Sequence, residues 1–291
     1  MIRLLAIDVD GTLLNSKKEL TAGTRRALEL ATNAGIHPVI ATGRMKTELQ
    51  PLREQLPMVR YVITCTGAEV LDLQTGETIS RDPISAEEMR RLYEKLAGLD
   101  ILHQVFSEHD GRIHNSAAAV DRLAHYTTPA LEKSFRGTHV LERDLDAFVA
   151  AYTGSVNKMH MYFGSVADRE EAQRRLSGLP YEILSSEEKD LEIMAPGVDK
   201  AHGLRQLAQK LGIRQEETAA IGDGDNDAAM LRWAGLGIAM GNASAAAREA
   251  ADLETADCDH EGLAKAVTEI LQRDPYEKQA ENIKGKMQIG F

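Results

Sequence analysis

The chain has 291 residues, of which 43% are hydrophobic and 27% charged, a composition typical of a globular protein with one large domain or two modest ones. A formal net charge of -11 makes nucleic acid and anionic membrane surfaces poor partners. The N-terminus reaches Asp8 before a signal-peptide core forms, and no apolar run approaches the roughly 20 residues of a membrane helix. Cys65 and Cys258 have no metal or redox spacing, so we expect a cytoplasmic protein with reduced thiols.

The first third of the chain alternates between strand and helix patterns. Apolar runs predict strands at 4–7, 37–41 and 61–64, and amphipathic segments predict helices at 20–34 and 45–56. Strands separated by helices favour a parallel sheet with right-handed crossovers. This part of the sequence therefore indicates an α/β fold.

The pattern changes in the middle of the chain. Gln74-Thr75-Gly76 and Asp110-Gly111 each separate two short strand-like runs, which predicts two hairpins. Ser85 and Glu88 form a capping box that opens a helix ending near residue 98. Further patterns predict helices at 120–126, 145–152 and 167–176 and strands at 158–163, 181–184 and 191–194. This mixture predicts a separate α+β unit with an antiparallel sheet.

The alternation of strand and helix returns at Lys200. The patterns predict strands at 218–221 and 236–240 and helices at 200–211, 227–234, 244–251 and 260–271. We therefore predict that residues 1–82 and 195–272 form one α/β domain and that residues 83–194 form a second, inserted domain. The remaining residues, 273–291, are expected to be a polar tail.

Polar turns follow three of the predicted strands. They are Asp8-Val9-Asp10, Thr42-Gly43-Arg44 and the segment 222–227, Gly-Asp-Gly-Asp-Asn-Asp. The carboxyl ends of parallel strands line up along one edge of an open sheet, where sites form. The sequence therefore predicts that these three turns meet.

The predicted edge carries four carboxylates, those of Asp8, Asp10, Asp223 and Asp227. Such a cluster needs a cation, and an all-oxygen donor set without His or Cys favours Mg2+. An ordinary helix cap is the alternative role for Asp225 and Asn226. A calcium loop is excluded because Ala228 and Ala234 occupy its glycine and glutamate positions, and a phosphate loop ending in Gly-Lys-Ser/Thr is absent from the sequence.

Two further features indicate an anionic ligand. Thr42 and Gly43 offer a hydroxyl and backbone N–H groups at a helix start, although an ordinary cap is an equally good reading there. Lys200 lies at a helix start, where the macrodipole disfavours a cation, which indicates an acidic or anionic neighbour unless the lysine is simply on the surface. The nine histidines show no ligand spacing, so we expect core or surface roles for them.

Four ordered motifs resemble those of the haloacid dehalogenase (HAD) superfamily, in the spacing of its Cof-type sugar-phosphate phosphatases (subfamily IIB). The motifs are Asp8-Val9-Asp10-Gly11-Thr12-Leu13-Leu14, Thr42-Gly43-Arg44, Gly197-Val198-Asp199-Lys200 and 222–231. The resemblance covers the chain to about residue 272 and implies a Rossmann-like core with an inserted α+β cap of the C2 type. The chain departs from the family at Cys65-Thr66-Gly67-Ala68, often Asn-Gly-Ala, and at Asp199-Lys200-Ala201, often Ser-Lys-Gly. Both departures lie near the expected substrate entrance and bear on substrate preference.

The resemblance also implies residue roles. Asp8 is expected to be the nucleophile that becomes an aspartyl-phosphate, and Asp10 the general acid and then base, with its pKa raised in the substrate complex. Mg2+ is expected to bind the Asp8 side chain, the Asp10 backbone carbonyl and Asp223, with Asp227 close by. Phosphoryl contacts are expected from Thr42, Gly43 and Lys200, and Asn226 is expected to contact the substrate or Lys200.

The sequence therefore predicts a Mg2+-dependent phosphatase of small phosphorylated metabolites, either sugar phosphates or phosphorylated cofactors such as flavin mononucleotide or pyridoxal phosphate. Two alternatives stay open: a phosphohexose mutase of the same superfamily, and a non-catalytic regulator that binds a phosphorylated ligand. Relatives in the superfamily that lack the second aspartate do not split their intermediate in this way, so the resemblance at Asp8 and Asp10 implies hydrolysis. We expect a monomer or a homodimer.

Overall fold

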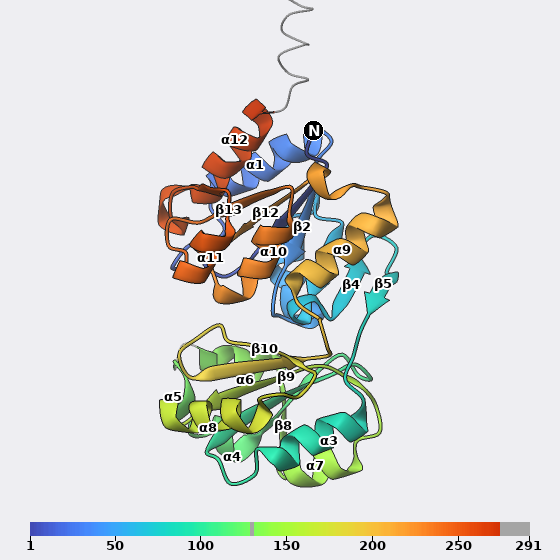
Figure 1. Cartoon of the computed structure of the whole chain (residues 1–291), viewed down its shortest axis with the longest axis vertical. Coiled ribbons are helices and arrows are strands. Elements are labelled where there is room, and N and C mark those ends of the chain that lie inside the picture. The colour runs from blue at the N-terminus through green and yellow to red at the C-terminus, as the bar shows by residue number, and fades with distance from the viewer. Residues whose placement is uncertain (129–130, 274–291) are drawn as a thin grey trace, which may run out of the picture.

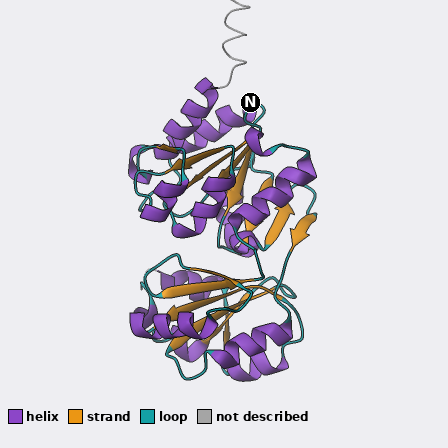
Figure 2. Ribbon diagram, viewed as in Figure 1, coloured by secondary structure: helices purple, strands orange, loops and turns teal. Residues whose placement is uncertain are grey.

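The computed structural model describes residues 1–128 and 131–273, and these form two sheets, each flanked by helices (Figure 1, Figure 2). We call residues 1–82 and 195–273 the core and residues 83–194 the cap; the boundaries at 83 and 194 stay predictions. The cap lies against one end of the core, with α3 and α7 farthest from it (Figure 1). The predicted tail falls outside the described residues except for Arg273. Within the described ranges, no helix is both long and apolar enough to cross a bilayer.

The core sheet has the order β14-β13-β12-β1-β2-β3-β4-β5. Strands β14 through β3 are parallel, and the hairpin β4–β5 adds two antiparallel strands at one edge. The predicted parallel-sheet α/β fold is therefore confirmed. The strands are β1 Leu4–Ile7, β2 His37–Ala41, β3 Tyr61–Thr64, β4 Glu69–Asp72, β5 Thr78–Arg81, β12 Thr218–Gly222, β13 Leu236–Ala239 and β14 Leu253–Glu254.

Helices cover both faces of the core sheet because alternate side chains of its strands point to opposite layers. Leu5 and Ile7 pack with α1 and α12, whereas Leu4 and Ala6 pack with α9, α10 and α11. The α-helices of the core are α1 Ala22–Asn33, α2 Gln50–Gln55, α9 Lys200–Leu211, α10 Ala228–Trp233, α11 Ala245–Ala250 and α12 Gly262–Arg273. Its short 3-10 turns are η1 Lys46–Leu49, η2 Cys65–Gly67, η4 Gln215–Glu217, η5 Asp225–Asp227 and η6 Cys258–His260.

The cap sheet has the order β10-β11-β9-β6-β7-β8. Its strands are β6 Ile101–Ser107, β7 Ile113–Ser116, β8 Val140–Glu142, β9 Val156–Phe163, β10 Glu182–Leu184 and β11 Asp190–Met194. The prediction of a wholly antiparallel sheet is wrong at one edge, since β7 and β8 pair in parallel. Parallel neighbours need a crossover, and the segment between them supplies it with short helices.

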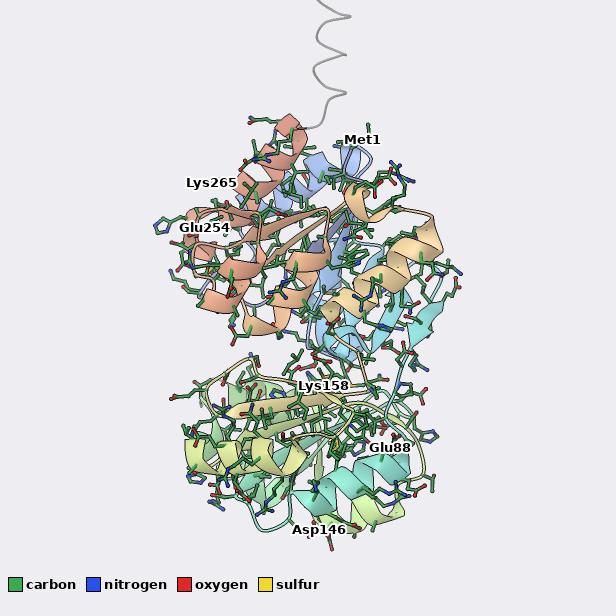
Figure 3. All side chains as sticks on the ribbon, in the orientation of Figure 1. Met1, Glu88, Asp146, Lys158, Glu254 and Lys265 are labelled. Atoms are coloured by element: carbon green, nitrogen blue, oxygen red, sulfur yellow. The ribbon has the colours of Figure 1, made fainter. Side chains whose placement is uncertain are left out.

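The two faces of the cap sheet differ in chemistry. One face carries apolar residues of β6 and β9, such as Val105, Met159 and Met161, and packs on α3 Ala86–Lys95, α7 Leu145–Ala151 and α8 Val166–Leu176. The other face is covered in part by α4 Ala117–Val120, α5 Leu123–Tyr126 and α6 Glu132–Thr138. Lys158 and His160 belong to this second face, because they alternate with Met159 and Met161 along β9. Figure 3 shows Lys158 on the side of the cap that is turned to the core.

Candidate active site

The strand register brings the three predicted polar turns together at one edge of the core sheet. Ile7 of β1 lies level with Ile221 of β12 and with Ile40 of β2. Asp8 therefore leaves its strand beside the ends of both neighbours, and its backbone N–H donates to the Ile221 carbonyl at 3.0 Å. The convergence expected from the strand ends is observed in the structure.

Lys200 is the central cation of this edge. It is the first residue of α9, its side chain is fully buried, and its Nζ lies 2.6 Å from Asp8 Oδ1 and 2.5 Å from Asp227 Oδ1. Burial alone would lower the pKa of Lys200, but Asp227 and Asp8 outweigh it and raise that pKa above its ordinary value. These ion pairs account for a lysine placed against the helix macrodipole, and the acidic neighbour expected from the sequence is present.

Three of the four predicted carboxylates form one cluster, in which oxygens of Asp8, Asp223 and Asp227 lie within 4.8 Å of one another. Burial raises the pKa of Asp8 to about 8 and that of Asp223 to about 6, and repulsion from Asp227 adds to both shifts. Gly11 lies against the cluster, because a Cβ there would be 2.4 Å from Asp223 Oδ2. Burial and mutual repulsion make these carboxylates costly to ionise, and a bound divalent cation would relieve that cost. Their oxygens are also the ligands that a hard cation prefers, so these residues fit the predicted metal.

Neighbouring polar groups orient the cluster. Asp227 Oδ2 accepts the N–H groups of Asp223 and Gly224 at 3.0 and 2.9 Å. Asp223 accepts hydrogen bonds from Thr12 Oγ1 at 2.7 Å and from Asn242 Nδ2 at 3.1 Å. Thr12 and Asn242 were not predicted to belong to the site, although Asn242 follows the end of β13, where the rule for strand ends would have identified it.

Asp10 lies outside the carboxylate cluster and is held by cations instead. The Arg44 side chain donates to both carboxylate oxygens of Asp10, at 2.9 and 2.7 Å, and Lys18 Nζ donates at 2.9 Å. Burial opposes ionisation of Asp10, but Arg44 and Lys18 together lower its pKa below the ordinary value. A raised pKa of Asp10 is expected in the substrate complex; in this structure the carboxyl is held ionised, mainly by Arg44, to which no role had been assigned.

The remaining predicted residues surround this edge at different depths. Thr42 is buried, and its Oγ1 accepts the N–H of Arg44 at 3.2 Å. The Gly43 carbonyl accepts a hydrogen bond from Lys158 of the cap at 2.9 Å. Asn226 lies in the η5 turn and is partly exposed, and among the described residues no hydrogen bond joins it to Lys200. Its expected contact with substrate stays a prediction.

A second acidic cluster lies in the cap, where ligand atoms of His160, Asp190 and Glu192 are within 4.8 Å of one another. Asp190 already accepts hydrogen bonds from His160, Ser185, Ser186 and the backbone of residues 186 and 187, and Glu192 pairs with Lys158 at 3.0 Å. The polar groups of this cluster already have hydrogen-bond or ion-pair partners, so we interpret it as a buried ion-pair network and not as a metal site. No spacing in the sequence links His160 to these carboxylates.

The geometry agrees with comparisons to known proteins. Residues 5–267 match the haloacid dehalogenase-like hydrolase family. The chain is 30% identical over 277 residues to the putative phosphatase YxeH of Bacillus subtilis, covering 93% of this chain and 99% of the relative. It is 28% identical to the B. subtilis 5-amino-6-(5-phospho-D-ribitylamino)uracil phosphatase YcsE, over 91% and 94% of the two chains.

A solved structure, that of the HAD subclass IIB sugar phosphatase BT4131, aligns with a TM-score of 0.77 and 25% identity over 92% of this chain and 98% of that one. The matched segments include every strand end that contributes to the carboxylate and lysine cluster. The chain therefore belongs to the haloacid dehalogenase-like hydrolases, and it is a phosphatase.

Proposed function

We propose that this phosphatase hydrolyses small phosphorylated metabolites through an aspartyl-phosphate on Asp8 and that it requires Mg2+. The observation that carries the proposal is the meeting of Asp8, Asp223, Asp227 and Lys200 at the end of the parallel strands. A phosphoryl dianion is repelled by carboxylates unless cations neutralise it, and phosphoryl transfer depends mainly on placement and charge neutralisation. Lys200 supplies one cation, and Mg2+ held by Asp8, Asp223 and the Asp10 carbonyl, with Asp227 nearby, would supply the other.

In the proposed reaction an Asp8 oxygen bonds to phosphorus as the bond from phosphorus to the leaving oxygen breaks. Asp10 gives its proton to that oxygen, and in the second step it takes a proton from the water that displaces phosphate from Asp8. For Asp10 to carry a proton, the guanidinium of Arg44 has to leave it. Thr42 and Gly43 are proposed to donate hydrogen bonds to the phosphoryl oxygens, and Asn226 to contact the substrate.

The substrate class is chosen from the similar proteins. One relative is named for 5-amino-6-(5-phospho-D-ribitylamino)uracil and one solved structure is titled a sugar phosphatase. We therefore propose a phosphomonoester of a sugar, of a sugar alcohol chain or of a small cofactor as the substrate of this chain.

The test is phosphate release by the purified protein with Mg2+ from a panel of sugar phosphates, ribityl phosphates, flavin mononucleotide and pyridoxal phosphate. We expect turnover of at least one compound and a loss of about 10^4-fold or more for Asp8→Asn, because no other group replaces the nucleophile. Asp225→Asn is the matched control, since Asp225 is an exposed carboxylate in the same loop as Asp223. No release from any compound contradicts the proposal, and isomer conversion without free phosphate would favour the mutase alternative.

A further inference from the structure

Lys158 is a cap residue whose charged end contacts the core. It lies on β9, is 1% exposed, and its Nζ donates to the Gly43 carbonyl at 2.9 Å. The same ammonium lies 3.0 Å from Glu192 Oε1 and 3.4 Å from Thr66 Oγ1. An ammonium has three hydrogens, and these three acceptors use all of them. Two of the acceptors belong to the core, so Lys158 bridges the two units.

Two residues of the cap also contact this ammonium. Lys158 Nζ lies 4.5 Å from the centre of the Phe106 ring, and Glu192 is its carboxylate partner from the adjacent strand β11. Glu192 in turn accepts a hydrogen bond from Thr66 Oγ1 at 2.6 Å. The carboxylate and the aromatic ring restrict the orientation of this buried lysine side chain, and in that orientation its ammonium faces the Gly43 carbonyl.

The carbonyl that Lys158 binds belongs to the peptide group between Gly43 and Arg44. The N–H of this same peptide donates to Thr42 Oγ1 at 3.2 Å. Hydrogen bonds in series polarise one another, so a cation on the carbonyl strengthens the N–H as a donor. Because the Thr42 hydroxyl accepts from Arg44, its own hydrogen is directed away from Arg44 and is available to a phosphoryl oxygen.

The turn that carries Gly43 is closely packed by the same groups. A Cβ on Gly43 would lie 3.3 Å from Lys158 Nζ, 3.4 Å from Glu192 Oε1 and 3.4 Å from Thr66 Oγ1. Thr66 has a left-handed backbone, with φ of 57°, and its N–H donates to the Thr42 carbonyl at 3.0 Å. A non-glycine residue keeps that conformation only where its surroundings hold it. The position of the turn at residues 42–44 is therefore set from the cap side as well as by the core sheet.

We propose that Lys158 is a positioning residue of the phosphatase reaction. With the cap against the core, its ammonium fixes the Gly43 carbonyl and, through the Arg44 N–H, directs the Thr42 hydroxyl toward the phosphoryl group. The proposal rests on the proposed function, in which Thr42 binds the phosphoryl oxygens. It couples catalysis to the position of the cap, since the cation is absent from the turn when the cap is away.

The test is steady-state kinetics of Lys158→Met on the substrate found for the wild-type protein. We expect kcat to fall by about 10- to 100-fold with little change in KM. The reason is that a misplaced hydrogen-bond donor to the phosphoryl group stabilises the transition state less well. Lys189→Met is the matched control: Lys189 also donates to a backbone carbonyl, that of His125 at 3.0 Å, but within the cap. We expect wild-type kinetics for this control.

Two further variants separate positioning from a merely structural role. Lys158→Met/Glu192→Gln removes the carboxylate left without its cation, so a folding defect should be relieved while kcat stays low. In a Thr42→Ala background, Lys158→Met should have little additional effect, because the hydroxyl that it positions is gone. The proposal is overturned if Lys158→Met keeps the wild-type kcat, if the double variant restores kcat, if only KM rises, or if the Lys158 and Thr42 effects multiply independently. Failure of the proposed function looks different, because the wild-type protein would then release no phosphate.

Discussion

In the core, β1 and β12 are buried along their whole length, and the charged residues Asp8 and Asp223 come just after the last strand residue. In the cap, Lys158 and His160 on β9 and Glu192 on β11 are charged or polar residues within strands, and all three are buried. The core thus collects charge at one edge of an apolar sheet, whereas the cap spreads it over one face of a sheet whose other face is apolar.

The two arrangements of charge indicate different roles for the core and the cap. Carboxylates at strand ends are held by turns and helix starts of one rigid sheet, so their mutual distances are fixed without the cap. The role of the polar face of the cap sheet, by contrast, depends on which groups lie opposite it, and here these are Gly43 and Thr66 of the core. We therefore expect core variants to remove the chemistry itself and cap variants to change rate or stability by smaller amounts.

Removal of metal is expected to have the largest effect. After treatment with a chelator, phosphate release should fall to background and return with Mg2+, because the core carboxylates then repel both one another and the substrate. Asp223→Asn should raise the Mg2+ concentration needed for half-maximal activity by at least about 10-fold. Asp190→Asn in the cap is the control, since its carboxylate is already saturated by neighbouring donors. An equal shift for both variants would contradict the assignment of the metal to the core.

Loss of the proposed general acid ranks second. Asp10→Asn should lower kcat by about 10^3-fold, because an amide neither protonates the leaving oxygen nor activates water. Unchanged circular dichroism would show that the fold is retained, as expected for a partly exposed residue at the sheet edge. A substrate with a very good leaving group, such as p-nitrophenyl phosphate, should be less affected in its first step. Equal losses in the first step on all substrates would count against the role of Asp10 as the acid.

The third prediction concerns the buried cation of the core. Lys200→Met leaves Asp8 and Asp227 without their shared partner, which should lower the free energy of unfolding by about 3–5 kcal/mol in metal-free buffer. Lys200→Met/Asp227→Asn should recover part of that stability but no activity. Lys210→Met, on the exposed side of the same helix, should unfold at the wild-type denaturant concentration. Denaturant melts of the variants provide the measurement, and an unaltered midpoint for Lys200→Met would refute the ion-pair description.

The smallest prediction concerns the apolar side of the cap and is a pH effect. Burial lowers the pKa of His103 from 6.5 to about 4, and its Nδ1 is buried without a hydrogen-bond partner. Between these pH values the unfolded chain binds a proton that the folded protein rejects, so stability is lost as pH falls through this window. The loss should approach about 3 kcal/mol by pH 4. The His103 ring packs at a tilt against the ring of Tyr93 on α3, and the side chain lies on the opposite face of the sheet from Lys158.

His103→Leu should remove that acid-dependent loss without altering kcat or KM. The measurement is the unfolding free energy of both proteins at pH 7.5 and pH 4.5. If the variant loses as much stability as the wild type, another group is responsible. If its kinetics change, the two faces of the cap sheet are not independent, and the contrast between core edge and cap face is weaker than proposed.

Much of the core and its site could be predicted from the sequence because the signals are local. The run Leu4-Leu5-Ala6-Ile7 followed by Asp8 predicts a buried strand with a polar site at its end. The buried strand is confirmed, and the carboxylate and lysine cluster lies at its end. The capping box of Ser85 and Glu88 opens α3 as predicted. The helix predicted at 200–211 has these ends in the structure, where Gly212 follows it in the left-handed conformation. In each case the deciding contacts are made within a few residues along the chain.

Other elements were decided by tertiary structure or by weak local signals. The predicted helix at 45–56 is a 3-10 turn followed by a short α-helix, because Pro51 is tolerated only in a first helical turn. Helix α6 and strands β8 and β14 went unpredicted, since two- to seven-residue elements carry little periodicity.

By itself, the sequence determined the strand ends and the carboxylate and lysine motifs, because these follow from residue type and local order. The class of chemistry followed from the resemblance of these motifs to those of the haloacid dehalogenase superfamily. Only the tertiary structure decided that Arg44 holds Asp10 and that Lys158 reaches the Gly43 carbonyl. The alternation of polar and apolar residues on β9 shows that its two faces differ, but it does not show what each face meets. The contact of the polar face with the core depends on how the cap packs, and it joins Lys158 to Gly43, which are 115 positions apart in the sequence.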